Sequence, residues 1–316
     1  MSKWLSLLVV GLCAVGWRWY ESLDMGRTIY NHRPGACRQV HGPGKMFLYD
    51  FNQKLGKDQL RAIELPIKGA DFDQEDFHPQ GLTHWVVNGV IRLYVISHSD
   101  EFKHSVEVFD YDPSGPALSH RQSIKHRRFI RPNDLVAVGP DQFIYTNDGH
   151  NGGSVYYWDG KEPHRLITGV TVANGIAFDA RHNMLFVVET YHKSLNVYNL
   201  DKEKTNATLL STVNLSSACD NLFIDQDGSV LAGCHPIFFE AMTAMKDCEG
   251  KATSPSQILR VKFDSDYKTA AVSEPYSNDG KEVSGSSMAV LYNNQMLIGT
   301  VCKGLLHCEI ADHSVL

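Results

Sequence analysis

The chain has 316 residues, of which 43% are hydrophobic and 21% charged, so it can bury a large core. The formal charge of -6 and the lack of a basic run of the nucleic-acid-binding type argue against a nucleic-acid partner. The length allows two domains, but all-β folds often run this long as one domain.

An apolar run, WLSLLVVGLCAVGW, extends from Trp4 to Trp17. Its fourteen residues match the hydrophobic part of a signal peptide and are short for a membrane-spanning helix. Ala14 and Gly16 fit a cleavage site, whereas the flanking tryptophans fit an uncleaved anchor at a membrane interface. The residues leave both outcomes open, and we expect the anchor to be retained.

Either outcome directs the chain into the secretory route. We therefore predict an extracellular protein, or one anchored in the plasma membrane or the endoplasmic reticulum. The expected organisation is an uncleaved signal or anchor segment at 1–20, a polar linker at 21–36 and one domain at 37–316. Two glycosylation sequons, at Asn206 and Asn214, agree with this route.

Seven cysteines in an oxidising compartment predict at least one disulfide. Cys37 precedes the first expected strand and Cys308 lies in the last one, so a bridge between them would join the two ends of the domain. Four further cysteines cannot be paired from the sequence: Cys219, Cys234, Cys248 and Cys302.

Short runs rich in Val, Ile, Phe and Tyr follow Cys37 at spacings of about 8 to 12 residues, with turn residues between them. Examples are Arg92–Ser97, Val106–Tyr111 and Leu185–Glu189. This rhythm is all-β and shows no regular alternation of strand and helix. The one helical candidate, Phe238–Lys246, is either a cap over one face of the fold or, as we expect, a loop helix.

Polar side chains recur where several of these strands begin. The pairs are Gln80-Gly81, Asn133-Asp134, Asn174-Gly175 and Asp220-Asn221. The last three are separated by 41 and 46 positions, a period typical of a β-propeller with one blade per repeat. Equivalent residues of the blades lie at equal heights around one axis, so we expect these oxygens to converge on the central channel.

Five stretches resemble the paraoxonase/arylesterase family, in one collinear order over nearly the whole chain. They are Pro132–Pro140, Ala173–Ile176, Asp220-Asn221, Gly233–Pro236 and Leu297–Val301. The resemblance implies an all-β fold, a six-bladed β-propeller preceded by an N-terminal hydrophobic anchor helix.

The polar pairs supply amide and carboxylate oxygens without thiolate or imidazole, a donor set that suits calcium better than zinc. The alternative is that they only cap turns at the strand starts. The resemblance implies two Ca2+ sites. The residues expected at the catalytic ion are Asn133, Asn174, Asp220 and Asn221. A structural ion would take Asp134 and the backbone carbonyl of Leu82.

The chemistry implied is hydrolysis of esters or lactones, in which calcium stabilises the oxyanion and a histidine takes a proton from the attacking water. His98 matches one member of the family's catalytic histidine pair, and Gln80 stands at the position of the other. Gln80 cannot exchange a proton at neutral pH. His78, His150 and His235 are further candidates, although a single histidine is more often structural than catalytic.

The chain departs from the family between Cys37 and the strand at Met46, where only Arg38–Lys45 are present. In the family this interval holds a long strand pair with a Glu-Asp pair that binds both calcium ions. We therefore expect one incomplete blade, and weaker calcium binding unless Asp148, Glu189 or water compensates.

Two functions are consistent with these residues. The first is a calcium-dependent hydrolase that acts on small aryl esters and lactones. The second is a catalytically impaired paraoxonase-like propeller, tethered to a membrane, that acts as a chaperone or accessory subunit for a membrane protein. In either case the N-terminus would contact a membrane or lipoprotein surface. A nucleophilic Cys234-His235 dyad is disfavoured, because neighbours in a strand point to opposite faces.

Overall fold

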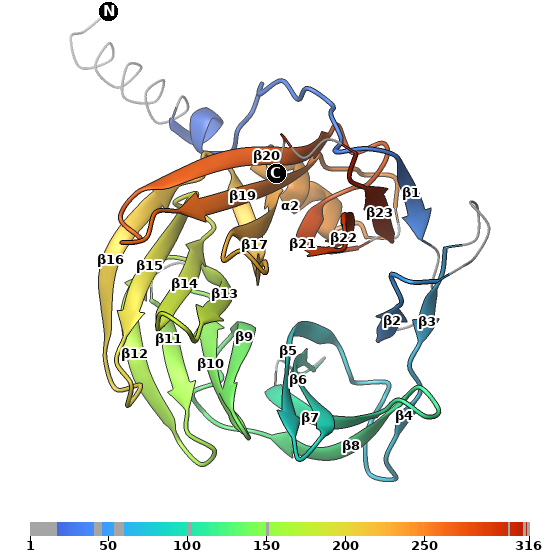
Figure 1. Cartoon of the computed structure of the whole chain (residues 1–316), viewed down its shortest axis with the longest axis vertical. Helices are drawn as coiled ribbons and strands as arrows, with labels where there is room; N and C mark the ends of the chain where they lie inside the picture. The colour runs from blue at the N-terminus through green and yellow to red at the C-terminus, as the bar shows by residue number, and fades with distance from the viewer. Residues whose placement is uncertain are drawn as a thin grey trace, which may run out of the picture.

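The computed structural model describes residues 18–40, 46–53, 60–99, 101, 103–149, 152–248, 250–302, 304–311 and 314. It confirms an all-β propeller, with separate sheets arranged as blades around a central axis (Figure 1). In blades II to IV, defined below, the strands follow one another outward from the axis, so each blade is completed before the chain enters the next.

Blade I contains β4 (Ile67–Lys68), β5 (Pro79–Val87), β6 (Val90–His98), β7 (His104–Asp112) and β8 (Ala117–Ile124). Blade II contains β9 (Pro132–Gly139), β10 (Gln142–Asn147), β11 (Gly153–Trp158) and β12 (Pro163–Val170). Blade III contains β13 (Ala173–Asp179), β14 (Met184–Glu189), β15 (Ser194–Leu200) and β16 (Ala207–Asn214). Blade IV contains β17 (Ala218–Ile224), β18 (Val230–His235), β19 (Ser256–Phe263) and β20 (Ala270–Asn278). Blade V contains β21 (Ser286–Tyr292), β22 (Gln295–Thr300), β23 (Leu305–Glu309) and β1 (Cys37–Val40).

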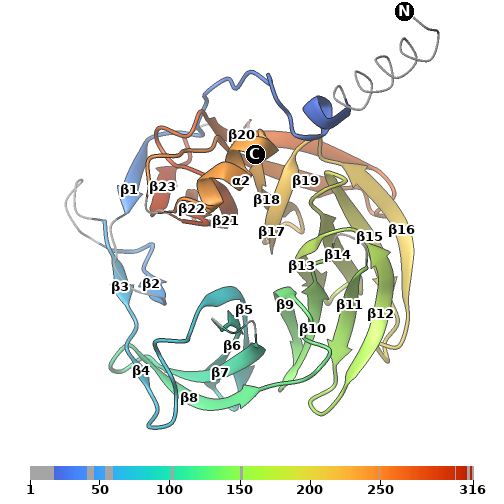
Figure 2. The ribbon, with the colours of Figure 1, turned by 180° about the vertical axis from the view of Figure 1, so that it is seen from behind.

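The prediction of six blades is wrong, because the described residues form five. Between blades V and I lies only a two-stranded sheet, made of β2 (Phe47–Tyr49) and β3 (Ala62–Glu64) (Figure 2). A four-stranded blade takes about 40–45 residues. The chain from the end of β1 at Val40 to the start of β4 at Ile67 is too short to provide one.

Blade V is completed by the two ends of the domain. The strand β1 pairs antiparallel with β23, and Cys37 lies opposite Cys308 in this ladder. A disulfide joins these two residues across a sequence separation of 271. Covalent closure of so long a loop restricts the unfolded chain and thereby stabilises the closed arrangement of blade V.

The hydrophobic core lies between neighbouring blades. Ile144 of blade II packs in one cluster with Leu185 and Val187 of blade III, for example. The middle strand β14 is therefore apolar and almost fully buried, whereas the outer strand β16 alternates toward solvent. The middle strand β14 thus reads as a nearly continuous apolar run in the sequence.

The expected helix forms as α2 (Phe238–Met245), on one face of the ring beside β21 (Figure 1). It buries Ala241 and Ala244 and leaves Phe239 exposed. The cysteines whose pairing the sequence left open form two disulfides, Cys219–Cys234 and Cys248–Cys302.

The segment before β1 lies against blades III and IV. Leu23 accepts a backbone hydrogen bond from Phe239, and Asp24 forms a 2.6 Å ion pair with Lys193. The predicted apolar anchor at Trp4–Trp17 lies outside the described residues. Within the part of the chain that the structure describes, no helix has both the length and the apolar character needed to cross a membrane.

Candidate functional site

Each of the five inner strands contains a β-bulge, and four of these bulges fall on the polar pairs identified in the sequence. The extra residue lies at Gln80-Gly81 in β5, Asn133-Asp134 in β9, Asn174-Gly175 in β13, Asp220-Asn221 in β17 and Ser287 in β21. A bulge places two residues opposite one on the partner strand and re-aims their side chains. The repeated polar pairs are therefore repeated irregularities of the innermost strand.

Two glycines in these bulges allow neighbouring inner strands to approach closely. A Cβ on Gly175 would lie 2.2 Å from the carbonyl oxygen of Asp220, and one on Gly81 would lie 2.6 Å from the Cα of Asp134. Both distances are shorter than any real contact of this kind. The small residue is required at these positions, and the four polar pairs consequently lie side by side.

Asp134 and Thr146 connect the inner strands of blades II and III. The Asp134 carboxylate accepts backbone hydrogen bonds from Leu135 (2.8 Å) and Ile176 (3.0 Å). The Thr146 hydroxyl donates to the Asn174 carbonyl at 2.7 Å and accepts from the Asp134 amide at 3.1 Å. These bonds fix the position of the Asn174 backbone relative to Asp134.

Two carboxylates at this site lie in surroundings that disfavour their charge. Burial raises the pKa of Asp134 to about 7, although backbone N–H donors partly oppose the rise. Burial also raises the pKa of Asp220 to about 7, with a further contribution from the charge of Asp134. Asn174 donates a hydrogen bond to Asp220 that lowers this pKa again, but not enough to restore it. The charge of Asp134 therefore acts on Asp220, and cations bound at these carboxylates would stabilise the ionised form of both.

Unsatisfied polar atoms lie beside these carboxylates. Asn174 Oδ1 is buried and has no hydrogen-bond partner among the described residues. Both ring nitrogens of His235 are also buried without a hydrogen-bond partner among the described residues. Its Nε2 lies 3.9 Å from Asp220 Oδ2. Burial lowers the pKa of His235 to about 4, so the ring is neutral at physiological pH. Buried polar atoms without partners are uncommon in native proteins and indicate a ligand, water or ion.

A disulfide holds the strand pair next to one bulge. Cys219 and Cys234 lie opposite each other in β17 and β18, immediately before the interruption at Asp220-Asn221. Both cysteines are fully buried. Because Asp220 follows Cys219 and His235 follows Cys234, the covalent bond restrains the distance between these two titratable side chains.

His98 ends β6 close to Asn133. Its Nε2 lies 2.6 Å from the carbonyl oxygen of Pro132, the residue before Asn133. A carbonyl only accepts hydrogen bonds, so Nε2 carries the proton and Nδ1 of the neutral ring has the basic lone pair. The His98 ring also lies 4.5 Å from that of His104, its register partner in β7. Burial and then the charge of His98 lower the pKa of His104.

The other sequence candidates lie in different surroundings. Gln80 is exposed in the bulge of β5, and the Leu82 side chain, two residues further, is 53% exposed. His78 donates its backbone N–H to Ser97 Oγ and lies before the same strand. His150 lies outside the described residues. The acceptor residues Asn206 and Asn214 are both solvent-exposed.

The oxygen atoms near the bulges fit a hard cation, although they carry little negative charge. In the described ranges no three His, Cys, Asp or Glu side chains cluster as a metal site. The oxygens near the bulges come instead from two carboxylates and several amides, a combination that calcium accepts. The orphaned Asn174 oxygen and the mutual repulsion of Asp134 and Asp220 are the observations that favour an ion here.

Sequence reasoning missed two contributors to this site. Thr146 reads as an ordinary strand residue and His104 as the start of a strand. Thr146 lies opposite Asn133-Asp134, and His104 lies opposite His98. These positions can be identified only once the strand pairing is known.

Comparisons with known proteins agree with this geometry. The family model described as Arylesterase matches residues 33–310. The chain belongs to the arylesterase family.

Three relatives show how far the similarity extends. The serum paraoxonase/lactonase 3 of Oryctolagus cuniculus is 32% identical over 288 residues, covering 85% of this chain and 77% of that protein. The serum paraoxonase/arylesterase 2 of Gallus gallus is 31% identical with the same coverage. The mechanosensory abnormality protein 6 of Caenorhabditis elegans is 26% identical over 359 residues, covering 97% of this chain and 94% of that protein. That last alignment is longer than this arylesterase-family chain, so the relative contains residues that the chain lacks.

The close approach of inner strands predicts that Gly175→Ala destabilises the protein. The new Cβ would overlap the Asp220 carbonyl, and relief requires the inner strands to move apart, at a cost of about 2–3 kcal/mol. Urea denaturation monitored by fluorescence measures this cost. Gly115→Ala is the matched control, because nothing lies within 4 Å of its Cβ position. Equal midpoints for the two variants would show that the strands are not constrained at Gly175.

Proposed function

We propose that this chain is a calcium-dependent hydrolase of small aryl esters and lactones. The observation that supports this most directly is the convergence of Asn174, Asp134 and Asp220 at neighbouring bulges, next to His98 on blade I. Membership of the arylesterase family, and relatives named paraoxonase, lactonase or arylesterase, support a hydrolase of this general kind.

The residues proposed to hold the catalytic ion are Asn133, Asn174, Asp220 and Asn221. A second ion would be held by Asp134 and the Leu82 carbonyl. When bound, calcium would polarise the substrate carbonyl and stabilise the oxyanion that forms. Because only one carboxylate is available for each of the two ions, each dication is compensated by a single negative charge, and we propose weaker calcium binding than a site with more carboxylates would have.

His98 is the proposed general base. Its Nε2–H is held by the Pro132 carbonyl, so the ring is oriented and Nδ1 is the atom that takes the proton from water. His104 packs against the ring, and burial followed by the neighbouring His98 lowers the pKa of His104, so simultaneous charging of the two rings is disfavoured. Gln80 cannot join this proton transfer, and its exposed amide is proposed to orient substrate or water instead.

A second candidate function is an accessory or chaperone role for a membrane protein, without catalysis. Gln80 and the shortage of carboxylates favour it, because both weaken the hydrolytic site. The similarity to a Caenorhabditis elegans protein named for a mechanosensory abnormality extends over almost the whole of both chains. The two functions differ in whether the folded protein hydrolyses an ester at all.

We also propose that the N-terminus anchors the protein to a membrane or lipoprotein surface in the secretory route. The first described residues expose Trp19 and Tyr20, aromatic side chains of the kind enriched at membrane interfaces. Glycans at the exposed Asn206 and Asn214 belong to the same proposal.

The hydrolase proposal is tested with phenyl acetate and a lactone, in calcium and in chelator. We expect hydrolysis in calcium alone, and a loss of about 100-fold or more in kcat/KM for His98→Gln, because a general base contributes about 10²–10⁴-fold. His84→Gln is the control, since His84 is an exposed histidine on β5. Folded protein that hydrolyses neither substrate would contradict the hydrolase and favour the accessory role. Activity that survives both chelation and Asn174→Ala would contradict the calcium mechanism.

The raised pKa values predict how calcium and pH act on stability. In the folded protein Asp134 and Asp220 ionise near pH 7, above their unfolded value of 3.8, so without calcium the stability they contribute is lost as pH rises from about 4 to 7. Calcium binds the ionised carboxylates, so its stabilising effect is full above pH 7 and declines toward pH 5.5. Thermal unfolding with calcium or chelator at pH 8.0 and 5.5 measures both effects.

Asp220→Asn serves as the internal control for this measurement. The variant removes a charge that is costly to bury, so we expect its unfolding temperature in chelator at pH 8.0 to rise above that of the wild type. The calcium response should fall at the same time, because only the ion proposed at Asp134 remains. A calcium shift of equal size at both pH values, or one that is undiminished in this variant, would show that calcium binds elsewhere.

A further inference from the structure

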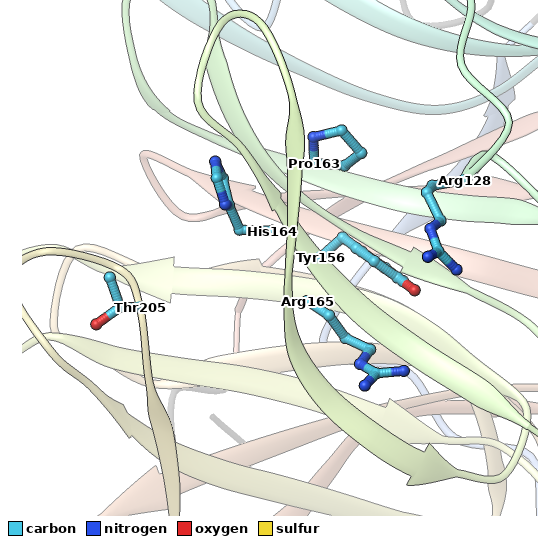
Figure 3. Close-up of a pocket in the computed structure, with 6 residues that line it drawn as sticks. All are labelled: Arg128, Tyr156, Pro163, His164, Arg165 and Thr205. Carbon is cyan, nitrogen blue, oxygen red and sulfur yellow. The ribbon is translucent and has the colours of Figure 1, made fainter.

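A cavity of about 490 Å³ lies far from the central site, on the outer side of blade II. It is lined by Arg128, Tyr156, Pro163, His164, Arg165 and Thr205 (Figure 3). Three elements meet there: the loop after β8, the outer strands β11 and β12, and the turn between β15 and β16. Its volume is within the range of about 300–1,000 Å³ typical of small-molecule sites.

Three hydrogen-bond donors face this cavity without a protein partner: the guanidinium groups of Arg128 and Arg165 and the hydroxyl of Tyr156. Arg165 lies opposite Tyr156 in the ladder between β12 and β11. Both guanidinium groups and the Tyr156 hydroxyl lie on the same side of β12 (Figure 3). Among the described residues, none accepts a hydrogen bond or ion pair from these three groups, whereas Arg92 and Arg260, for example, each pair with two carboxylates.

The Arg128 guanidinium is presented by a rigid loop. The buried side chain of Asn147 donates to the Arg128 carbonyl at 3.0 Å and accepts the backbone N–H groups of Ile130 and Arg131. Tyr145 also donates to the Arg128 carbonyl, at 3.4 Å, and stacks on Tyr156 with centroids 5.6 Å apart. The loop and the floor of the cavity are therefore held in one arrangement before any ligand binds.

The loop that carries Arg128 is basic, although the whole chain is acidic. The chain has 36 acidic and 30 basic residues, yet the loop contains Lys125, Arg127 and Arg128 within four positions. The acidic side chains nearby bind other groups: Asp159 pairs with His164 at 2.8 Å, Glu162 with His126 at 3.4 Å, and Asp201 accepts the Thr205 hydroxyl at 2.6 Å. None of these carboxylates pairs with Arg128 or Arg165, so both guanidinium groups are available to a ligand.

We propose that this cavity binds a phosphate monoester. At neutral pH such a group carries about -1.5 to -2 charges, which matches two guanidinium groups. Each guanidinium would donate two parallel hydrogen bonds to phosphate oxygens, and the Tyr156 hydroxyl would donate one more. The cavity is larger than a phosphate, so the organic part of the ligand would lie against Pro163 and the Tyr156 ring.

Calorimetric titration of the full-length protein with glycerol 3-phosphate tests this site, with glycerol as the uncharged control. We expect Arg128→Ala and Arg165→Ala each to weaken binding at least tenfold. Arg165→Lys should weaken it severalfold, because lysine keeps the charge but cannot donate two parallel hydrogen bonds. Arg127→Ala is the matched control, an exposed neighbour that does not line the cavity, and should change affinity less than twofold.

Vesicles distinguish the two sources of such a group. Flotation with phosphatidate vesicles that depends on Arg128 and Arg165, and that glycerol 3-phosphate displaces, identifies a lipid headgroup. Binding of glycerol 3-phosphate without flotation identifies a soluble ligand. The proposal is overturned if the wild type binds neither probe, or if Arg127→Ala weakens binding as much as Arg128→Ala does. Ester hydrolysis is measured separately, so failure here leaves the proposed hydrolase intact.

Discussion

The structure depends on how closely five inner strands pack around the axis. Gly81 and Gly175 have no side chain, so the backbones of blades I and II, and of blades III and IV, approach at the bulges. Four of the five inner-strand bulges then carry a polar pair. Carboxylate and amide oxygens are thereby buried together at the centre of an otherwise apolar ring, where each needs a partner.

That arrangement has an electrostatic cost that a bound cation would remove. Asp134 and Asp220 are buried near each other and both resist ionisation, while Asn174 Oδ1 has no partner in the described part of the chain. A fold that concentrated these groups only to cap turns would satisfy their hydrogen bonds locally, whereas one of the two amides that Asp134 binds belongs to Ile176 on the next blade. The unsatisfied Asn174 oxygen and the paired repulsion instead indicate a ligand-binding centre whose charge is low for calcium.

The sequence predicts the propeller and the position of the centre because both depend on local patterns. Asn133-Asp134 and Asn174-Gly175 are visible as polar pairs at strand starts, and the apolar runs mark strands buried between blades. The short interval after Cys37 predicts an incomplete blade, but not that only a two-stranded sheet lies between blades V and I, because that depends on strand pairing. The Cys219–Cys234 disulfide and the contact of His98 with His104 depend on strand register. Register follows from pairing across the sheet, which no spacing along the chain reveals.

A crystal structure of the protein grown with calcium tests the central claim most directly. The account predicts an ion at the bulges with Asn174 Oδ1 and an Asp220 carboxylate oxygen about 2.3–2.6 Å away, the distance range for calcium and oxygen. Electron density for only a water at this position, at saturating calcium and pH 8.0, would contradict it.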